Sequence, residues 1–212
     1  MPDTTEKKEF KAKYTASMTF SESSVKTLCH TQYSSFQWRK KLFRFIVGLM
    51  FIVSGLFLMG SQVFGIIMIA VGCFMITGQN VQPNQLARQA LKEFDGRFPV
   101  VHYWFAPEGI CFNEKGENPS PYSGIIRLVE DKNYLYVYVS ELSAHMIDAS
   151  TIKGKDGRDG LKKYISEKCG LEWTVPLSGI NVTLGNIKKI IASEDRADKG
   201  SFKGERLPYK HR

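Results

Sequence analysis

The clearest pattern in the sequence is a block without charged side chains that runs from Phe45 to Ala87. Within it, Phe45–Met59 and Val63–Thr77 are each apolar at twelve of fifteen positions and carry no polar stripe. An amphipathic surface helix would show one polar face. One straight helix of this length would measure about 64 Å, against a hydrocarbon core of about 30 Å. The block therefore predicts a transmembrane hairpin over residues 42–79, with helices at 42–59 and 61–78. A re-entrant hairpin that does not cross stays open as an alternative.

Glycines recur at a helical spacing inside both apolar segments. Gly48 and Gly55 lie seven residues apart, as do Gly65 and Gly72. Small residues on one face of a membrane helix allow two backbones to approach closely. We therefore expect these four glycines to pack the two helices against each other.

Basic residues flank the hairpin and predict its orientation. The first flank holds Arg39, Lys40, Lys41 and Arg44, and a second group of basic residues follows the hairpin. The turn between the helices has no basic residue. Because basic flanks stay on the cytoplasmic side, the sequence predicts a multi-pass protein of the cell membrane with both termini in the cytoplasm.

The parts outside the hairpin alternate between strand and helix patterns. Residues 10–20 show a period of two, which predicts a strand with one buried face, and a capped helix completes the N-terminal segment 1–41. Residues 80–173 begin with a spacer helix and end with an amphipathic helix at 161–168. Between these helices, short apolar runs separated by turn residues predict an antiparallel meander; the runs are Pro99–Phe105, Gly109–Asn113, Gly124–Val129, Asn133–Ser140 and Ala144–Asp148.

These patterns together predict a membrane α+β protein. A meander with one helix buries both faces only if the sheet bends strongly, as in a partly open barrel plugged by the helix. The N-terminal strand has an unmatched apolar face, so we expect it to join this sheet. The two-helix hairpin would then be an insertion into one cytoplasmic, barrel-like antiparallel domain.

The order of these segments resembles the YcxB-like family of small bacterial membrane proteins. The likeness covers most of residues 10–170, including the basic WRKK at 38–41, the two close apolar helices and PEGICFNEKGENPSPYSGIIRLVEDKNYLYVYVSELSAHMID at 107–148. The resemblance implies a cytoplasmic domain similar to the pleckstrin-homology (PH) fold. It implies no known activity.

Candidate chemistry outside the membrane is sparse. The four histidines and four cysteines are scattered, with no C-x-x-C, H-E-x-x-H or nucleophile elbow, so we expect no metal site, cofactor or catalytic set. Tyr134, Tyr136 and Tyr138 alternate with apolar residues. One row must line the core, and the tyrosine row either faces a protein partner or is covered by another element.

The charge distribution narrows the possible partners. The net charge is +8, but residues 88–194 hold as many acidic as basic residues. The excess therefore lies in residues 1–44, before the hairpin, and in residues 195–212 of the basic tail 174–212. A nucleic-acid-binding protein would concentrate basic residues on its folded domain. We expect a non-enzymatic membrane protein that binds a protein partner at the inner membrane face. An anionic-lipid surface sensor or membrane-tethered scaffold using the basic residues is the alternative, and a homo-oligomer stays open.

Overall fold

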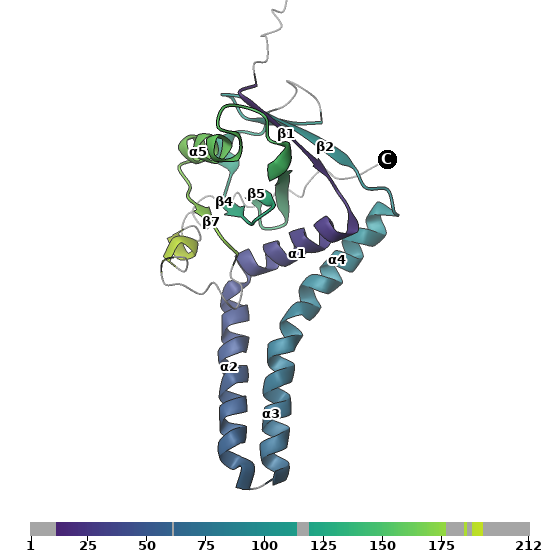
Figure 1. The fold of residues 1–212 in the computed structure, drawn as a ribbon, viewed down its shortest axis with the longest axis vertical. Helices are drawn as coiled ribbons and strands as arrows, with labels where there is room; N and C mark the ends of the chain where they lie inside the picture. The colour runs from purple at the N-terminus through teal and green to yellow at the C-terminus, as the bar shows by residue number, and fades with distance from the viewer. Residues whose placement is uncertain (1–11, 61, 114–118, 177–184, 186–187, 193–212) are drawn as a thin grey trace, which may run out of the picture. The chain divides into compact units, whose positions relative to one another are not determined.

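The computed structural model describes residues 12–60, 62–113, 119–176, 185 and 188–192 (Figure 1). They form two compact units. Thr19–Val100 and Pro176 belong to a helical unit, and the described residues through Met18 and from Val101 to Val175, with those after 184, belong to a strand-rich unit.

Four α-helices make up the helical unit: α1 (Glu22–Phe36), α2 (Trp38–Phe57), α3 (Gln62–Thr77) and α4 (Val81–Phe94). Short 3₁₀ turns, η1 (Leu58–Gly60) and η2 (Gly78–Asn80), follow α2 and α3. The predicted cap of α1 is present, since Ser21 and Ser24 bond each other's backbone N–H groups. Asp95 in the left-handed conformation ends α4.

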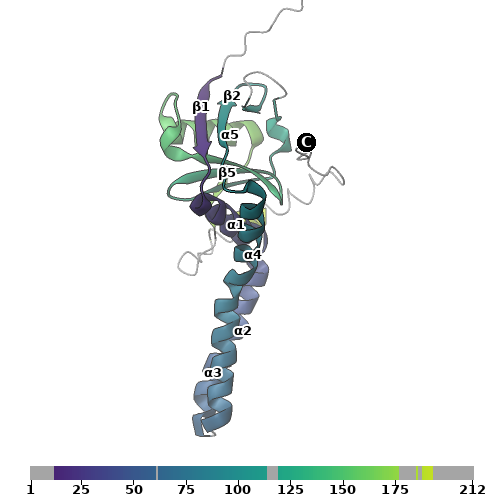
Figure 2. The ribbon, with the colours of Figure 1, turned by 90° about the vertical axis from the view of Figure 1, so that its right-hand side faces the viewer.

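The apolar helices α2 and α3 run side by side in opposite directions, as Figures 1 and 2 show. Two helical segments, Trp38–Gly60 and Val63–Phe94, are long and apolar enough to cross a membrane. Only 11% and 17% of their most apolar windows are buried. A core helix of a soluble protein would be mostly buried, so the exposure favours a lipid environment.

Seven strands form two sheets in the strand-rich unit. One sheet has the order β1-β2-β3, with β1 at Tyr14–Thr19, β2 at Val100–Phe105 and β3 at Ile110–Phe112. The other has the order β6-β5-β4-β7, from β4 (Arg127–Glu130), β5 (Tyr134–Ser140), β6 (Ser143–Asp148) and β7 (Trp173–Thr174). Neighbouring strands β2–β3, β4–β5 and β5–β6 are antiparallel, whereas β7 runs parallel to β4.

Strand β1 links the two sheets. It lies beside β2 in the first sheet, as expected from its unmatched apolar face. On its other side, Thr15 exchanges two backbone hydrogen bonds with Lys153, which follows β6 and the turn η4 (Ala149–Thr151). Among the described strands the pairing goes no further, so the predicted barrel-like sheet is present as two bridged sheets and not as a closed barrel.

Helix α5 (Gly157–Cys169) completes the core of this unit. Leu161 and Ile165 are fully buried, and Tyr164 contacts the rings of Tyr14 and Tyr122, the latter in the 3₁₀ turn η3 (Tyr122–Gly124). The side chain of His145 from β6 packs between the rings of Tyr103 and Phe112 from the other sheet. Aromatic contacts therefore join both sheets and the helix.

Candidate functional site

The basic flank predicted before the hairpin lies in the first two turns of α2. Arg39 and Lys40 are exposed, while Lys41 and Arg44 are partly buried. The guanidinium of Arg39 lies 5.6 Å from the ring centroid of Trp38. Long basic side chains and a Trp at a helix end are typical of the membrane–water interface.

A hollow of about 270 Å³ lies next to this flank, within the helical unit. Most of its wall is one face of α1, because residues 26, 27, 30, 31 and 34 recur at helical spacing. Helix α2 adds Lys41 from its first turn. The lining residues are Lys26, Thr27, His30, Thr31, Ser34, Lys41 and Pro176.

Polar and cationic groups line part of the hollow. The Lys41 ammonium donates a hydrogen bond to Ser34 Oγ at 3.2 Å, which leaves the Ser34 hydroxyl hydrogen free to point elsewhere. His30 Nε2 lies 2.8 Å from Asn84 Oδ1 of α4. Among the described residues, the lining includes two ammonium groups and no carboxylate. Such a lining attracts an anion.

The four predicted glycines lie where α2 and α3 meet, in two facing pairs. A Cβ atom added at Gly72 would lie 2.5 Å from the carbonyl oxygen of Gly48. One added at Gly55 would lie 2.8 Å from the carbonyl oxygen of Gly65. The two backbones therefore approach more closely than any residue with a side chain would permit.

The tyrosine row does not form the exposed face that the partner hypothesis required. Tyr136 and Tyr138 are both 0% exposed, and only Tyr134 is partly exposed. The strand register places Tyr136 and Tyr138 on the same face of the sheet as Val129 and Arg127, which are also buried. The sequence left a covered row open as the alternative, and the burial corrects the prediction of a partner face for these two residues.

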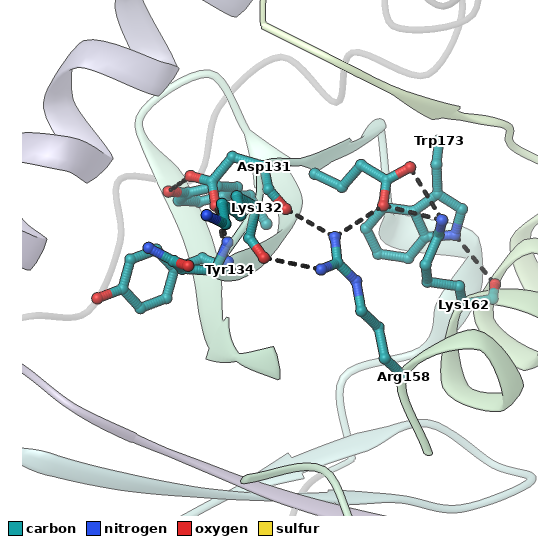
Figure 3. Close-up of polar contacts among 9 residues, drawn as sticks. Asp131, Lys132, Tyr134, Arg158, Lys162 and Trp173 are labelled. Carbon is teal, nitrogen blue, oxygen red and sulfur yellow. Dashed lines mark hydrogen bonds and ion pairs between the residues drawn. The ribbon is translucent and has the colours of Figure 1, made fainter. Parts of the chain in front are cut away.

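The glycine-rich segment 154–160, whose last four residues begin α5, leads into a cluster of ion pairs and hydrogen bonds (Figure 3). The guanidinium of Arg158 donates to Glu130 Oε2 at 3.0 Å and to the backbone oxygens of Asp131 and Lys132. The ammonium of Lys162 lies 2.8 Å from Glu130 Oε2. These groups fix α5 to the turn between β4 and β5, so their charges serve the fold.

Potential metal ligands stay apart. Among the described residues, no group of three or more His, Cys, Asp or Glu side chains converges. Burial lowers the pKa of His145 to about 4. His145 is therefore neutral at physiological pH.

The hollow was not predicted from the sequence, although its wall on α1 has a recognisable residue pattern. Five polar residues on one face of α1 follow the spacing of a helix. That pattern identifies a polar stripe, but a stripe alone is typical of a solvated face. What makes it a hollow is Lys41 from the next helix and Pro176 from far along the chain.

Comparisons with known proteins add no relative. No family model, curated protein or solved structure matches this chain.

Proposed function

We propose that this chain is an integral membrane protein whose α2–α3 hairpin crosses the bilayer. The observation that carries the proposal is the contrast between the two sides of the hairpin. Glycine backbones meet at its centre, while large apolar side chains such as Phe57 and Phe74 are 87% and 76% exposed. At 1.5 Å per residue, the segment 42–59, which follows Lys41, spans about 27 Å, close to the thickness of the hydrocarbon core.

The basic flank supports an orientation with both termini in the cytoplasm of the cell. Arg39, Lys40, Lys41 and Arg44 lie at the start of α2, and Arg88 and Lys92 lie in α4 beyond the other end of the hairpin. Basic residues are retained on the cytoplasmic side. The strand-rich unit then lies in the cytoplasm.

Element order supports the YcxB-like assignment and a PH-like cytoplasmic domain as parts of the same proposal. The hairpin falls in sequence between β1 and β2, which are neighbours in one sheet. An insertion between two adjacent strands leaves the surrounding fold connected. Two bridged sheets followed by helix α5 support the proposal of such a domain.

The function we propose is recognition of an anionic membrane surface by the basic residues near the hairpin. Two partly buried cations, Lys41 and Arg44, and the cationic groups that line part of the hollow favour it. Tyr136 and Tyr138, two candidates for a face that binds a protein partner, are buried. We propose a binding function and not catalysis. Charged groups such as Arg158 and Glu130 form ion pairs that hold the fold together. The basic tail after residue 194 lies outside the described residues.

Alkaline extraction of membranes from cells expressing the chain tests the anchor. We expect the protein to stay in the pellet with integral proteins, because helices buried in the hydrocarbon core resist this treatment. Release into the supernatant would contradict the proposal.

Lipid analysis of the purified chain tests the recognition. After extraction in a mild detergent, the co-purified phospholipid should be enriched in anionic species over the parent membrane. The enrichment should fall as salt rises, since exposed charges are screened. A composition equal to that of the membrane would show that anionic lipid is not recognised.

A further inference from the structure

The charge-free block of the sequence continues beyond the end of the apolar helix α3. Helix α3 ends at Thr77, yet residues 78–87 also carry no charge, and Arg88 is the first charged residue after them. These residues form η2 and the first two turns of α4. On the other side of the hairpin, basic residues continue as far as Arg44 in α2. The two ends of the hairpin that face the same side of the membrane are therefore not alike.

Helix α4 leaves the line of α3 at η2, as Figure 1 shows. Pro83 has no backbone N–H to donate to the carbonyl of Gln79, and its ring crowds that carbonyl, so the regular helix is interrupted there. Helix α1 packs against one side of α4, where Pro83 and Ala87 are buried. His30 Nε2 of α1 lies 2.8 Å from Asn84 Oδ1 of α4. These contacts hold α4 on one side and leave its other side exposed.

The exposed side of the first two turns of α4 combines apolar and amide side chains. Val81 and Leu86 are 54% and 42% exposed, and Gln82 and Gln85 are exposed beside them. A helix that faces water usually carries charged residues on that side. The hydrocarbon core, in contrast, would leave the amide groups without hydrogen-bond partners. This face therefore suits the headgroup region, which offers both hydrogen-bond partners and apolar contact.

The length of the uncharged stretch agrees with this location. At 1.5 Å per residue, residues 78–87 extend about 15 Å along the chain of helical turns. The interfacial layer is only about 5–7 Å thick on each side of the hydrocarbon core, so a helix that crosses it obliquely stays in it for longer. Arg88 follows Val81 by seven residues, two helical turns, and lies on the same side of α4. Its long side chain can reach the lipid phosphates from there.

We propose that the first two turns of α4 lie in the headgroup region of the membrane, with Val81 and Leu86 toward the lipid and Arg88 at the aqueous edge. The partner is the phospholipid layer, because the face continues the exposed apolar surface of α3, on which Phe74 is 76% exposed. The proposal rests on the membrane anchor proposed above. It goes further by assigning part of a third helix to the membrane and by fixing where the chain leaves it.

Spin labels on single cysteines measure the depth of α4 in the full chain. The background C73S/C169S removes the two thiols that are at least partly exposed among the described residues. The protein is reconstituted in vesicles of phosphatidylcholine and phosphatidylglycerol. Labels at V81C and L86C should collide more often with oxygen, which dissolves in lipid, than with a water-soluble nickel chelate. The ratio of the two collision rates should be higher at residue 81 than at residue 86.

Glu93→Cys is the matched control on the same helix. Glu93 is also exposed, but it lies about 18 Å farther along the helix than Val81. Its label should collide mainly with the nickel chelate. If the label at residue 86 behaves like that at residue 93, the first turns of α4 lie in water and the proposal is overturned. If the label at residue 86 collides rarely with both reagents, protein covers this face, and the lipid assignment is overturned.

A label on the natural Cys73, in a C169S variant, separates this proposal from that of the anchor. Cys73 is exposed within α3, so its label should favour oxygen if the hairpin crosses the bilayer. Oxygen access at residue 73 with nickel access at residue 86 would overturn only the placement of α4. Nickel access at residue 73 would overturn the anchor as well. Circular dichroism shows that each variant keeps its fold, and if L86C unfolds, Q82C on the same face takes its place.

Discussion

Gly72 is one of the four glycines that allow α2 and α3 to approach closely. A Cβ at Gly72 would lie 2.5 Å from the oxygen of Gly48 and 2.7 Å from Ile52 Cγ1. Gly72→Ala should therefore destabilise the hairpin by about 1–3 kcal/mol, the usual cost of overpacking. In thermal unfolding of the detergent-solubilised protein, each kcal/mol should lower Tm by roughly 2–4 °C. Gly78→Ala is the control, since its Cβ would meet nothing within 4 Å. Equal Tm values for the two variants would contradict the close packing.

His145 makes the stability of the strand-rich unit depend on pH. Burial lowers its pKa from 6.5 to about 4, so between these values the unfolded chain binds a proton that the folded chain does not. Stability is complete above pH 6.5 and falls as the pH drops toward 4, by roughly 3 kcal/mol in total. Chemical unfolding of the full chain at several pH values measures this loss.

His145→Phe is the matched variant for that experiment. Its ring keeps the packing against Tyr103 and Phe112 but binds no proton. The difference in unfolding free energy between wild type and variant should change over pH 4–6.5 and stay constant above it. A constant difference across the whole range would show that His145 does not control the pH dependence.

Strand β1 is the element that joins the two sheets. Thr15 donates its backbone N–H to the Lys153 oxygen at 3.0 Å. Thr15→Pro removes this donor and leaves an acceptor unsatisfied, so we expect a loss of about 1–3 kcal/mol in unfolding free energy. Thr15→Val keeps the N–H and a β-branched side chain, and it should unfold at nearly the wild-type denaturant concentration. If both variants unfold like wild type, β1 does not hold the sheets together.

Local pattern was sufficient for most elements because each has one buried face or a clear cap. Residues 10–20 alternate, and β1 is found at Tyr14–Thr19; residues before 12 lie outside the description. The predicted helices at 42–59 and 61–78 correspond to α2 and α3, although α2 begins earlier at Trp38. Arg and Lys are good helix formers, so the basic flank is part of the helix.

Elements that depend on tertiary contacts were not predictable in this way. β7 has two residues and exists only because it pairs with β4, so no periodic pattern marks it. In β5 both faces are buried, and alternation then fails to tell which row faces outward. The sequence therefore left open whether the tyrosine row faces a partner or is covered by another element.

At the scale of the whole molecule, the hairpin could be predicted from the sequence, but the hollow beside it could not. The absence of charge over Phe45–Ala87 is a property of the residues themselves. It therefore does not depend on how the other parts of the chain fold. A hollow such as that between Lys26 and Lys41 needs two helices to meet at a particular angle. Residue patterns within one helix do not contain that angle.

Thiol labelling in intact cells tests the orientation of the chain in the membrane. Gly60 is exposed in the turn between the membrane helices, and Cys169 is partly exposed at the end of α5. In a G60C/C169S variant, a membrane-impermeant maleimide should label the protein from outside, because the positive-inside rule places this turn there. The wild type should be labelled only after the cells are opened, and then at Cys169.

Cys73, exposed on α3, should react with this reagent only in detergent, since lipid covers it in the membrane. Labelling of Cys73 in opened membranes, or of Cys169 in intact cells, would contradict the proposed topology.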